Sequence, residues 1–419
     1  MTNKKLITPW ISVIGIGEDG VQGLSDSSIQ LIENAEIIIG GERHLKMLAG
    51  MVQPKNQIRT DWAKGFNKTL DLIEQKKGKN IVVLASGDPM YFGVGATLAR
   101  RFGGDALNVI PAVSSISLAC ARMGWSQPDV NVVTIHGRPA ENINRYLFNN
   151  AKIIALSNDG ESPSVVAKLL RAHGFAKSKI TVLENLGGEN ENYISGLAEN
   201  WQNSECAHLN IIAVECVADD NVSGHALVGG LADDAFNHDG QITKREVRAI
   251  TISSLAPCEG EVLWDVGSGS GSIAIEWMRG GKNMKAIAIE KDKTRAENIN
   301  SNAFNLGVTR LQVVCGAAPD VFAQISGHSP DAIFIGGGLT NGGEDLINQA
   351  WDALKPGGRL VVNSVTIKSE AIIFNFAELV GGELVRINIE RAKKIGHQQS
   401  FQPLKTVTQL IAHKPGAEN

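Results

Sequence analysis

Cysteine is scarce in this chain of 419 residues and follows no pairing pattern. There are five cysteines, an odd number, and only Cys206 lies close to a histidine, His208, with no second couple beside them. A disulfide framework or a zinc knuckle needs regularly spaced pairs. The sequence therefore predicts no metal site and a reducing compartment, the cytoplasm.

A surplus of positive charge is also missing. The 40 lysines and arginines face 44 acidic residues, which leaves a formal net charge of −4. General nucleic-acid binders need a basic surplus to neutralise phosphates, so we expect no nucleic-acid partner. An anionic small molecule is compatible with this balance, because a local cluster of cations can hold it.

Long apolar runs are absent as well. None approaches the roughly 18 residues that a membrane span needs. The apolar stretch 6–17 resembles a signal peptide, but Pro9 interrupts it and the acidic pair Glu18-Asp19 ends it. We expect a soluble protein with no membrane partner.

What the first half does contain is alternation. Short apolar runs typical of buried strands alternate with amphipathic stretches such as 27–34 and 94–102, which favours an α/β fold. The expected strands cover residues 10–16, 81–85, 130–135, 153–156, 180–183 and 209–214. Residues 191 to about 239 are polar and irregular around the last of these strands. We expect a first domain over 1–218, a linker over 219–235 and a second domain over 236–416, because no internal repeat relates the two halves.

The second domain begins with a helix signal. Thr243 and Glu246 fit the S/T-x-x-E capping box, which predicts a helix from there to about Leu255. Seven strands are expected after it, and they form a mostly parallel, Rossmann-like sheet. These strands cover residues 262–266, 286–290, 311–314, 332–335, 359–363, 384–389 and 406–413.

A glycine-rich turn follows the first of these strands, at Gly267, Gly269 and Gly271. The dinucleotide motif G-x-G-x-x-G requires glycine at position 272, which is Ser272. Asp265, just before the turn, opposes a pyrophosphate and suits a ligand that carries a sulfonium and an amino group. Glu290, at the end of the next strand, is placed to accept hydrogen bonds from both hydroxyls of a ribose, although an acid there serves NAD equally well.

These features together resemble the class I S-adenosylmethionine (SAM) methyltransferases. The small loop after the third strand would then pack against adenine, and Ala317 stands where an acid is often found, which excludes a polar side-chain contact to adenine there. The resemblance implies that SAM is bound by Thr243, Asp265, Gly267, Ser268, Gly269, Ser270, Gly271, Glu290, Gly316, Ala317 and Ala318.

Two glycine loops stand in the first domain. The first, 15–20, matches G-x-G-x-x-G, but the loop continues to Gly23 and the next helix is expected near Ser25. The acidic pair Glu18-Asp19 would also lie where phosphates should bind, so this motif points away from NAD.

The second loop, 85–95, follows a strand and contains a Gly-Asp-Pro turn, and residues 111–115 start a helix after the next strand. Both loops resemble the SAM-binding loops of the tetrapyrrole (class III) methylases, whose fold consists of two small α/β subdomains. The resemblance implies SAM contacts from Gly87, Asp88, Tyr91, Gly93, Ser114 and Ser115. His136 and Arg138 lie in a stretch that matches corrin-ring members of that family, and the resemblance implies that they contact the substrate.

The fusion of the two domains resembles the bifunctional corrin methyltransferases of cobalamin biosynthesis. It implies that the first domain methylates C5 of a precorrin-6 type ring, and that the second methylates C15 and removes CO2 from the ring-C acetate. The nucleophile would be a meso carbon of the ring, so no catalytic side chain is assigned. Whether the substrate carries cobalt stays open.

The anionic tetrapyrrole needs cations, and arginine suits carboxylates. Two clusters are candidates, one near residue 245 and one after the sixth strand, and they contain Lys244, Arg245, Arg248, Arg391, Lys393 and Lys394. We also expect a homo-oligomer. Two alternatives are kept: an NAD-linked oxidoreductase and a non-catalytic SAM-binding module.

Overall fold

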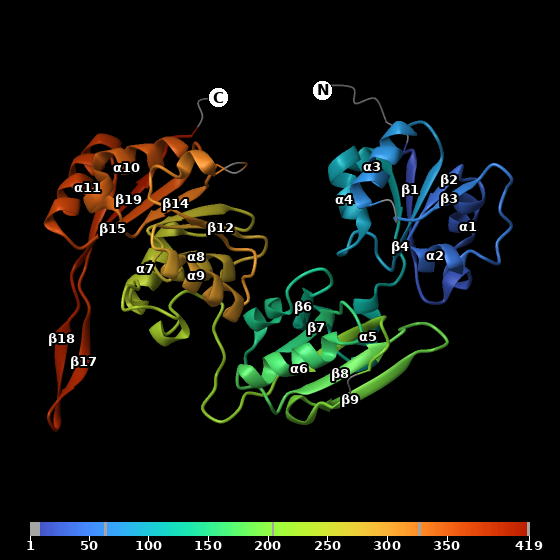
Figure 1. Ribbon diagram of the computed structural model, residues 1–419, viewed down its shortest axis with the longest axis horizontal. Helices are drawn as coiled ribbons and strands as arrows, with labels where there is room; N and C mark the ends of the chain where they lie inside the picture. The colour runs from blue at the N-terminus through green and yellow to red at the C-terminus, as the bar shows by residue number, and fades with distance from the viewer. Residues whose placement is uncertain (1–8, 63–64, 203–204, 326, 328, 417–419) are drawn as a thin grey trace. The chain divides into compact units, whose positions relative to one another are not determined.

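The computed structural model describes residues 9–62, 65–202, 205–325, 327 and 329–416. The chain divides into two compact units (Figure 1). The first consists of Met1–Arg138 and Asn150–Asp220, and the second of Pro139–Asn149 and Asn221–Asn419. The α/β class expected for both halves is confirmed. The boundaries differ from the expected ones, because the short segment Pro139–Asn149 groups with the second unit.

The first unit begins with a five-stranded parallel sheet in the order β3-β2-β4-β1-β5. Buried side chains on both faces pack against helices, which explains why its central strands are continuous apolar runs. The strands are β1 (Ile11–Ile16), β2 (Ile37–Ile39), β3 (Ile58–Thr60), β4 (Ile81–Ser86) and β5 (Leu107–Ile110). The helices are α1 (Asp26–Glu33), α2 (Glu42–Met47), α3 (Phe66–Gln75) and α4 (Val94–Phe102).

A second, mixed sheet completes the first unit, in the order β6-β7-β10-β8-β9. Only β6 and β7 pair in parallel. The strands are β6 (Asn131–Thr134), β7 (Lys152–Leu156), β8 (Lys179–Glu184), β9 (Asn192–Leu197) and β10 (Asn210–Glu215), and the helices are α5 (Ser115–Met123) and α6 (Ser162–Ala172). The sequence prediction of an irregular stretch from residue 191 is wrong, since β9 pairs with β8 over six residues. As a half-exposed edge strand, β9 lacks the apolar run that marks a buried one.

The second unit is built on a seven-stranded sheet in the order β13-β12-β11-β14-β15-β19-β16. Its first five strands are parallel, and β19 lies antiparallel between β15 and β16. The strands are β11 (Val262–Val266), β12 (Lys285–Glu290), β13 (Gln312–Cys315), β14 (Ala332–Ile335), β15 (Arg359–Ser364), β16 (Glu383–Ile387) and β19 (Val407–His413).

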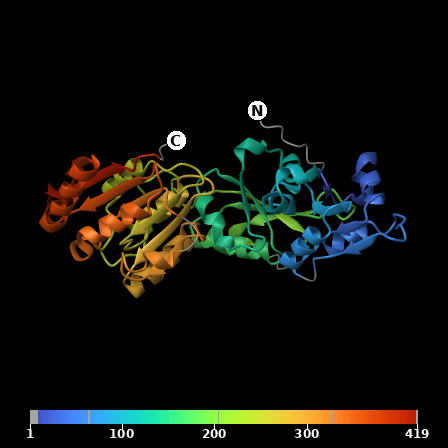
Figure 2. The ribbon, with the colours of Figure 1, turned by 90° about the horizontal axis from the view of Figure 1, so that it is seen from above.

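Helices cover both faces of this sheet, as the two views in Figure 1 and Figure 2 show. One apolar core joins the sheet to α7 (Arg245–Leu255), α8 (Ser272–Arg279) and α9 (Lys293–Asn305). The other joins it to α10 (Leu339–Ala353) and α11 (Ile367–Val380). The carboxyl ends of the parallel strands therefore meet at one edge of a three-layer unit, which is where ligands bind in open α/β sheets.

The capping box predicted at the start of α7 does not form. The cap residue is Lys244, one position later than expected, and no side chain caps the helix. Glu246 is drawn away by Arg391, whose Nη2 lies 2.5 Å from its Oε2, and the Thr243 carbonyl accepts a hydrogen bond from Arg248. Charge pairing thus takes the carboxylate that the box would have used.

A two-stranded arm was missed from the sequence. β17 (Glu390–Ile395) and β18 (Gln398–Pro403) pair only with each other and extend away from the seven-stranded sheet (Figure 1). Their residues are almost all exposed, so they lack the apolar signal of a core strand. Among the described residues, none of the helices is both long and apolar enough to cross a membrane.

Candidate functional site

A cavity of about 660 Å³ opens at the carboxyl ends of the strands in the second unit. Eight of the residues expected to bind the cofactor of this unit line it: Thr243, Gly267, Ser268, Gly269, Glu290, Gly316, Ala317 and Ala318. Asp265, Ser270 and Gly271 are not in its lining. The glycine turn, the end of β12 and the loop after β13 are therefore brought together around one space.

The glycine turn packs against another loop so closely that a side chain would not fit between them. Gly267 has φ +69°, and a Cβ there would stand 2.7 Å from the Cα of Gly337, in the loop after β14. Gly269 also has a positive φ, +61°. L-residues rarely adopt this conformation, so the turn between β11 and α8 requires glycine at these positions. The result is a cradle of bare backbone that a cofactor can approach.

Glu290 closes β12 and holds the glycine turn from the side. Its carboxylate is buried and accepts hydrogen bonds from the Gly269 N–H at 2.9 Å and the Asp292 N–H at 3.0 Å. The side chain also lines the cavity. A carboxylate has about four acceptor sites, so two remain for a ligand.

Asp265 supports the turn from behind. It is fully buried, and its Oδ2 accepts hydrogen bonds from the Ser268 hydroxyl at 2.6 Å and the Ala274 N–H at 3.1 Å. Within the described part of the chain, its Oδ1 has no hydrogen-bond partner. Burial raises the pKa of Asp265 to about 6, and the nearby charge of Glu290 acts in the same direction. Asp265 therefore positions Ser268, which does line the cavity.

The arginine and lysine candidates for substrate binding need correction. Arg248 is fully buried, 2.7 Å from Glu276 and 3.3 Å from Asp233, and it also donates to the Leu231 carbonyl. It is a structural ion-pair partner that cannot reach a substrate. Arg391 is paired with Asp233 and Glu246.

The two remaining lysines of the predicted cluster, Lys393 and Lys394, lie exposed on β17 and are not in the cavity lining. Arg245 pairs with Glu246. Of the predicted cations, Lys244 does line the cavity. The lining also includes cations that the sequence reading missed: Lys291, Arg295 and Lys405.

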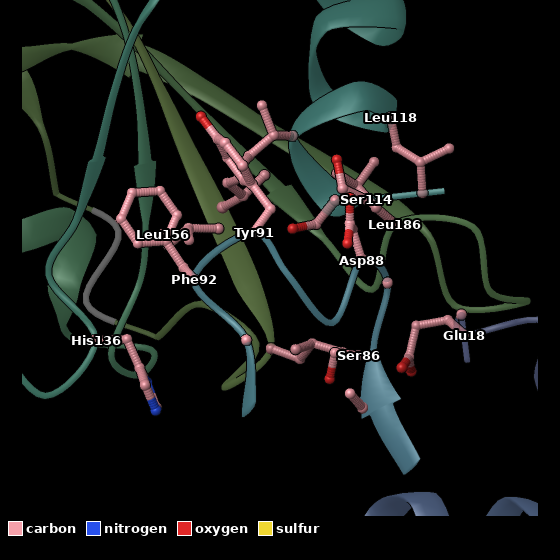
Figure 3. A pocket seen from close by; sticks show the side chains of 18 of the residues that line it. Glu18, Ser86, Asp88, Tyr91, Phe92, Ser114, Leu118, His136, Leu156 and Leu186 are labelled. Atoms are coloured by element: carbon pink, nitrogen blue, oxygen red, sulfur yellow. The ribbon is translucent and has the colours of Figure 1, made fainter. Parts of the chain in front are cut away.

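The first unit contains its own cavity, of about 450 Å³. Figure 3 shows side chains from both sheets around it, among them Asp88, Tyr91, Ser114 and His136. All eight residues predicted for this unit line it: Gly87, Asp88, Tyr91, Gly93, Ser114, Ser115, His136 and Arg138. The remaining wall is largely apolar, with Phe92, Leu156 and Leu186.

Main-chain contacts build this cavity. Gly87, with φ +55°, accepts a hydrogen bond from the Ala112 N–H and donates to the Ile16 carbonyl, both at 3.1 Å. A Cβ at Gly87 would stand 3.0 Å from the Cα of Ser114. Ser114 caps α5 by accepting from the Ser117 N–H. The loops after β1, β4 and β5 are thereby fixed against each other.

Sequence reasoning missed a polar group in this cavity. Arg43 Nη2 and His44 Nε2 lie 2.7 and 2.9 Å from the hydroxyl of Ser86, and Arg43 also pairs with Glu18. Burial lowers the pKa of His44 to about 4, and the charge of Arg43 adds to this, so the imidazole is neutral at pH 7. The sequence contains no motif that marks the short helix α2. Arg43 and His44 are recognised as part of the cavity only because the fold places α2 beside β4.

The G-x-G-x-x-G match at 15–20 is not a dinucleotide loop. A 3-10 turn occupies Gly20–Gly23, and α1 begins at Asp26 after the cap residue Ser25, as expected. Within the described ranges, no three His, Cys, Asp or Glu side chains gather in a way that could hold a metal ion.

Comparison with known proteins gives two family matches. Residues 11–201 match the model described as tetrapyrrole (corrin/porphyrin) methylases, and residues 234–414 match one described as a precorrin methyltransferase domain. The chain is 45% identical to a Sinorhizobium protein named precorrin-6Y C(5,15)-methyltransferase (decarboxylating). The alignment spans 405 residues, which are 96% of this chain and 96% of that protein.

Two further relatives are shorter. A Salmonella typhimurium protein named cobalt-precorrin-7 C(5)-methyltransferase is 29% identical over 181 residues, 43% of this chain and 87% of that protein. A solved structure of the C-terminal domain of precorrin-6Y C5,15-methyltransferase from Rhodobacter capsulatus is 39% identical, with a TM-score of 0.43; it covers 45% of this chain and 100% of that one.

The fold and the two matched domains define this chain as a methyltransferase. The chain belongs to the family of precorrin-6Y C(5,15)-methyltransferases (decarboxylating), which act in cobalamin biosynthesis. This membership does not favour the alternatives of an NAD-linked oxidoreductase or a non-catalytic module.

Proposed function

We propose that each unit binds its own molecule of SAM and acts on a precorrin-6 type ring. The first unit methylates C5, and the second methylates C15 and removes CO2 from the ring-C acetate. The observation that carries the proposal is the presence of two separate cavities, each built around a glycine turn at the carboxyl ends of parallel strands.

The residues of the second cavity fit SAM. The glycine turn at Gly267 and Gly269 offers backbone to the methionine part, and the free acceptor sites of Glu290 suit the ribose hydroxyls. The small side chains of Ala317 and Ala318 line the cavity and suit the flat face of adenine. Bound SAM supplies a methyl group on a positively charged sulfur, and a buried acid such as Asp265 favours positive charge nearby.

The first cavity suits a cofactor beside a flat ring. Gly87, Gly93, Asp88 and Ser114 provide the polar, bare-backbone part of its wall, and the exposed rings of Tyr91 and Phe92 provide apolar area for stacking.

His136 and Arg138 lie on the loop after β6 and face the same cavity, where they can contact a carboxylate of the ring. We retain both as substrate contacts.

The second cavity needs to hold carboxylates that stay on the product. Lys244, from the start of α7, and Lys405, from just before β19, line it and replace Arg248 and Arg391 in this role. The meso carbon attacks the methyl group, so positioning rather than a protein nucleophile accelerates the step.

We also propose that the enzyme is a homo-oligomer in the cytoplasm. The arm formed by β17 and β18 has unpaired edges and exposes Ile395 and Phe401, the latter at 69%. An exposed two-stranded ribbon is a template for pairing with another chain, and a second copy is the simplest partner.

The test is the reaction of the full chain with SAM and metal-free or cobalt-bearing precursor, followed by mass spectrometry. The expected product has gained two methyl groups and lost one CO2. Calorimetry is expected to show two SAM molecules bound per chain. Methyl gain without loss of CO2 would contradict the role of the second unit, and a single bound SAM would contradict separate sites.

A further inference from the structure

One side chain in the second cavity is held in a way that the proposed SAM site does not require. Asn363, near the carboxyl end of β15, lines the cavity and is partly exposed. Behind it lie Thr251 of α7 and Gln409 of β19, which are both fully buried. Buried polar groups on two other elements thus converge on one cavity residue.

The hydroxyl of Thr251 fixes the orientation of both amides. It donates its hydrogen to the Val247 carbonyl at 2.8 Å, so its oxygen can only accept from other partners. Asn363 Nδ2 and Gln409 Nε2 lie 2.9 and 3.2 Å from that oxygen. Gln409 Nε2 also donates to Asn363 Oδ1 at 2.8 Å, and Ser254 supports Gln409 Oε1 at 2.8 Å.

Among the residues that the structure describes, Asn363 keeps one N–H without a partner. An amide nitrogen has two hydrogens, and Thr251 takes one of them. Since Gln409 holds Asn363 Oδ1, the side chain cannot turn over without losing both bonds. Asn363 therefore offers a neutral, preorganised donor at the cavity wall.

Its position places that donor on the substrate side. The glycine turn follows β11, and β15 lies two strands away in the sheet. Strands are about 4.8 Å apart, so the end of β15 is about 10 Å from the turn in the direction away from Glu290 and the adenine loop. With SAM extending from the turn toward Glu290, as proposed above, the space beside Asn363 is left for the ring.

We propose that Asn363 binds the ring-C acetate that leaves as CO2 and holds it in the orientation needed for decarboxylation. This inference rests on the function proposed above. In the step, the C–C bond to the carboxylate breaks, its electron pair passes into the conjugated ring, and the side-chain carbon later takes a proton from water to become a methyl group. The electron pair can enter the ring only if the breaking bond stands out of the ring plane, so orientation governs the rate.

A neutral donor suits this task better than a cation. Negative charge leaves the carboxylate as CO2 forms, so a lysine or arginine would stabilise the starting state more than the transition state. A neutral amide N–H orients the carboxylate through a hydrogen bond that is weaker than an ion pair. The cations Lys244 and Lys405 remain for carboxylates that are retained.

The experiment measures CO2 released per methyl group transferred by the full-length enzyme. Asn363→Ala is expected to slow CO2 release roughly tenfold relative to methylation, the loss expected for one hydrogen bond to a charged group. A product that has gained two methyl groups but still carries the carboxyl then accumulates before CO2 is lost. Asn363→Asp, of nearly equal size, repels the acetate and is expected to shift the ratio further.

Two matched pairs separate positioning from general damage. Thr251→Val removes the oxygen that both amides use and is expected to shift the ratio as Asn363→Ala does, whereas Thr251→Ser keeps the hydroxyl and restores it. Asn300→Ala, on the exposed side of α9, is the control and leaves the ratio unchanged.

The outcomes are distinct from those that test the proposed function. If the wild-type enzyme neither methylates at C15 nor releases CO2, the proposed function fails. If it does both, but the Asn363 variants keep the wild-type ratio or lose both reactions in parallel, the role of Asn363 is overturned.

Discussion

The two cavities are built by different physical means. In the first unit, main-chain hydrogen bonds at Gly87 and a capped helix at Ser114 fix the loops, and none of the lining residues described there is a buried carboxylate. In the second unit, buried carboxylates hold the turn: Glu290 in the lining and Asp265 behind Ser268. A glycine turn can therefore be supported by main-chain hydrogen bonds or by buried carboxylates.

Glycine replacement tests whether the cavities are independent, and it has the largest expected effect. Gly267→Val drives a Cβ into the backbone of Gly337 and is expected to abolish methylation at C15 and CO2 loss, while C5 methylation continues. Gly87→Val is expected to abolish C5 methylation while methylation at C15 and CO2 loss continue, because its Cβ meets Ser114. Product mass spectra of both variants, with circular dichroism to confirm folding, decide the point. A variant that stays folded but loses both reactions would contradict the independence of the two sites.

A second comparison concerns the free energy of unfolding, which a buried ion pair in the second unit and an exposed ion pair in the first unit should affect to different extents. Arg248→Met leaves Glu276 buried without its arginine, which is expected to cost about 3–5 kcal/mol of the free energy of unfolding of the second unit. Urea denaturation of the full chain should show an earlier transition for that unit only. The exposed pair Lys177–Asp220 of the first unit is the contrast: Lys177→Ala is expected to leave the free energy of unfolding nearly unchanged, because solvent screens such a pair. Equal effects in both variants would remove the distinction.

The pH dependence of stability tests the role of Asp265. Its pKa of about 6 in the folded chain lies above the unfolded value of 3.8, so the native state binds the proton more tightly. The contribution of Asp265 to the free energy of unfolding therefore falls as pH rises from about 4 to about 6, by about 3 kcal/mol in total. Asp265→Asn removes this slope, which thermal melts of the wild type and the variant across that range would show. Parallel pH curves for the two proteins would mean that Asp265 carries no such shift.

Lysine replacement has the smallest expected effect and tests which cations face the substrate. Lys405→Ala is expected to raise the KM for the precursor about two- to fivefold, since an exposed ion pair contributes less than about 1 kcal/mol. Lys393→Ala, on the exposed arm, is expected to leave KM unchanged. Steady-state kinetics with saturating SAM compare them. A larger effect at Lys393 than at Lys405 would reverse the assignment.

The sequence predicted the fold well where strands are buried on both faces. The run 262–266 and the helix at 94–102 match the structure residue for residue. Exposed strands such as β9 and β17 were missed, because only burial produces an apolar run. The partly exposed strand β3 was missed for the same reason, whereas β2 is fully buried and was missed as well, because its run of three residues is short.

The candidate site followed the same division. Glycine turns are visible in sequence because positive φ and close approach restrict the residue type, and Gly87 and Gly267 both lie at such turns. The backbone places no such restriction on lysine or arginine, so the sequence does not show what these side chains contact. Arg248 and Arg391 could not be told from substrate ligands until the structure showed Glu276, Asp233 and Glu246 beside them. Asn363 left no pattern at all, since Thr251 and Gln409 are distant in the chain.

The segment Pro139–Asn149 has a consequence for how the chain is made. Its Arg145 donates to the carbonyls of Arg279 and Gly281, and Asn144 donates to that of Phe304. This segment emerges from the ribosome more than a hundred residues before the residues that carry those carbonyls. During synthesis it must wait as an open loop within a nearly finished first unit, and it finds its place only when the second unit folds.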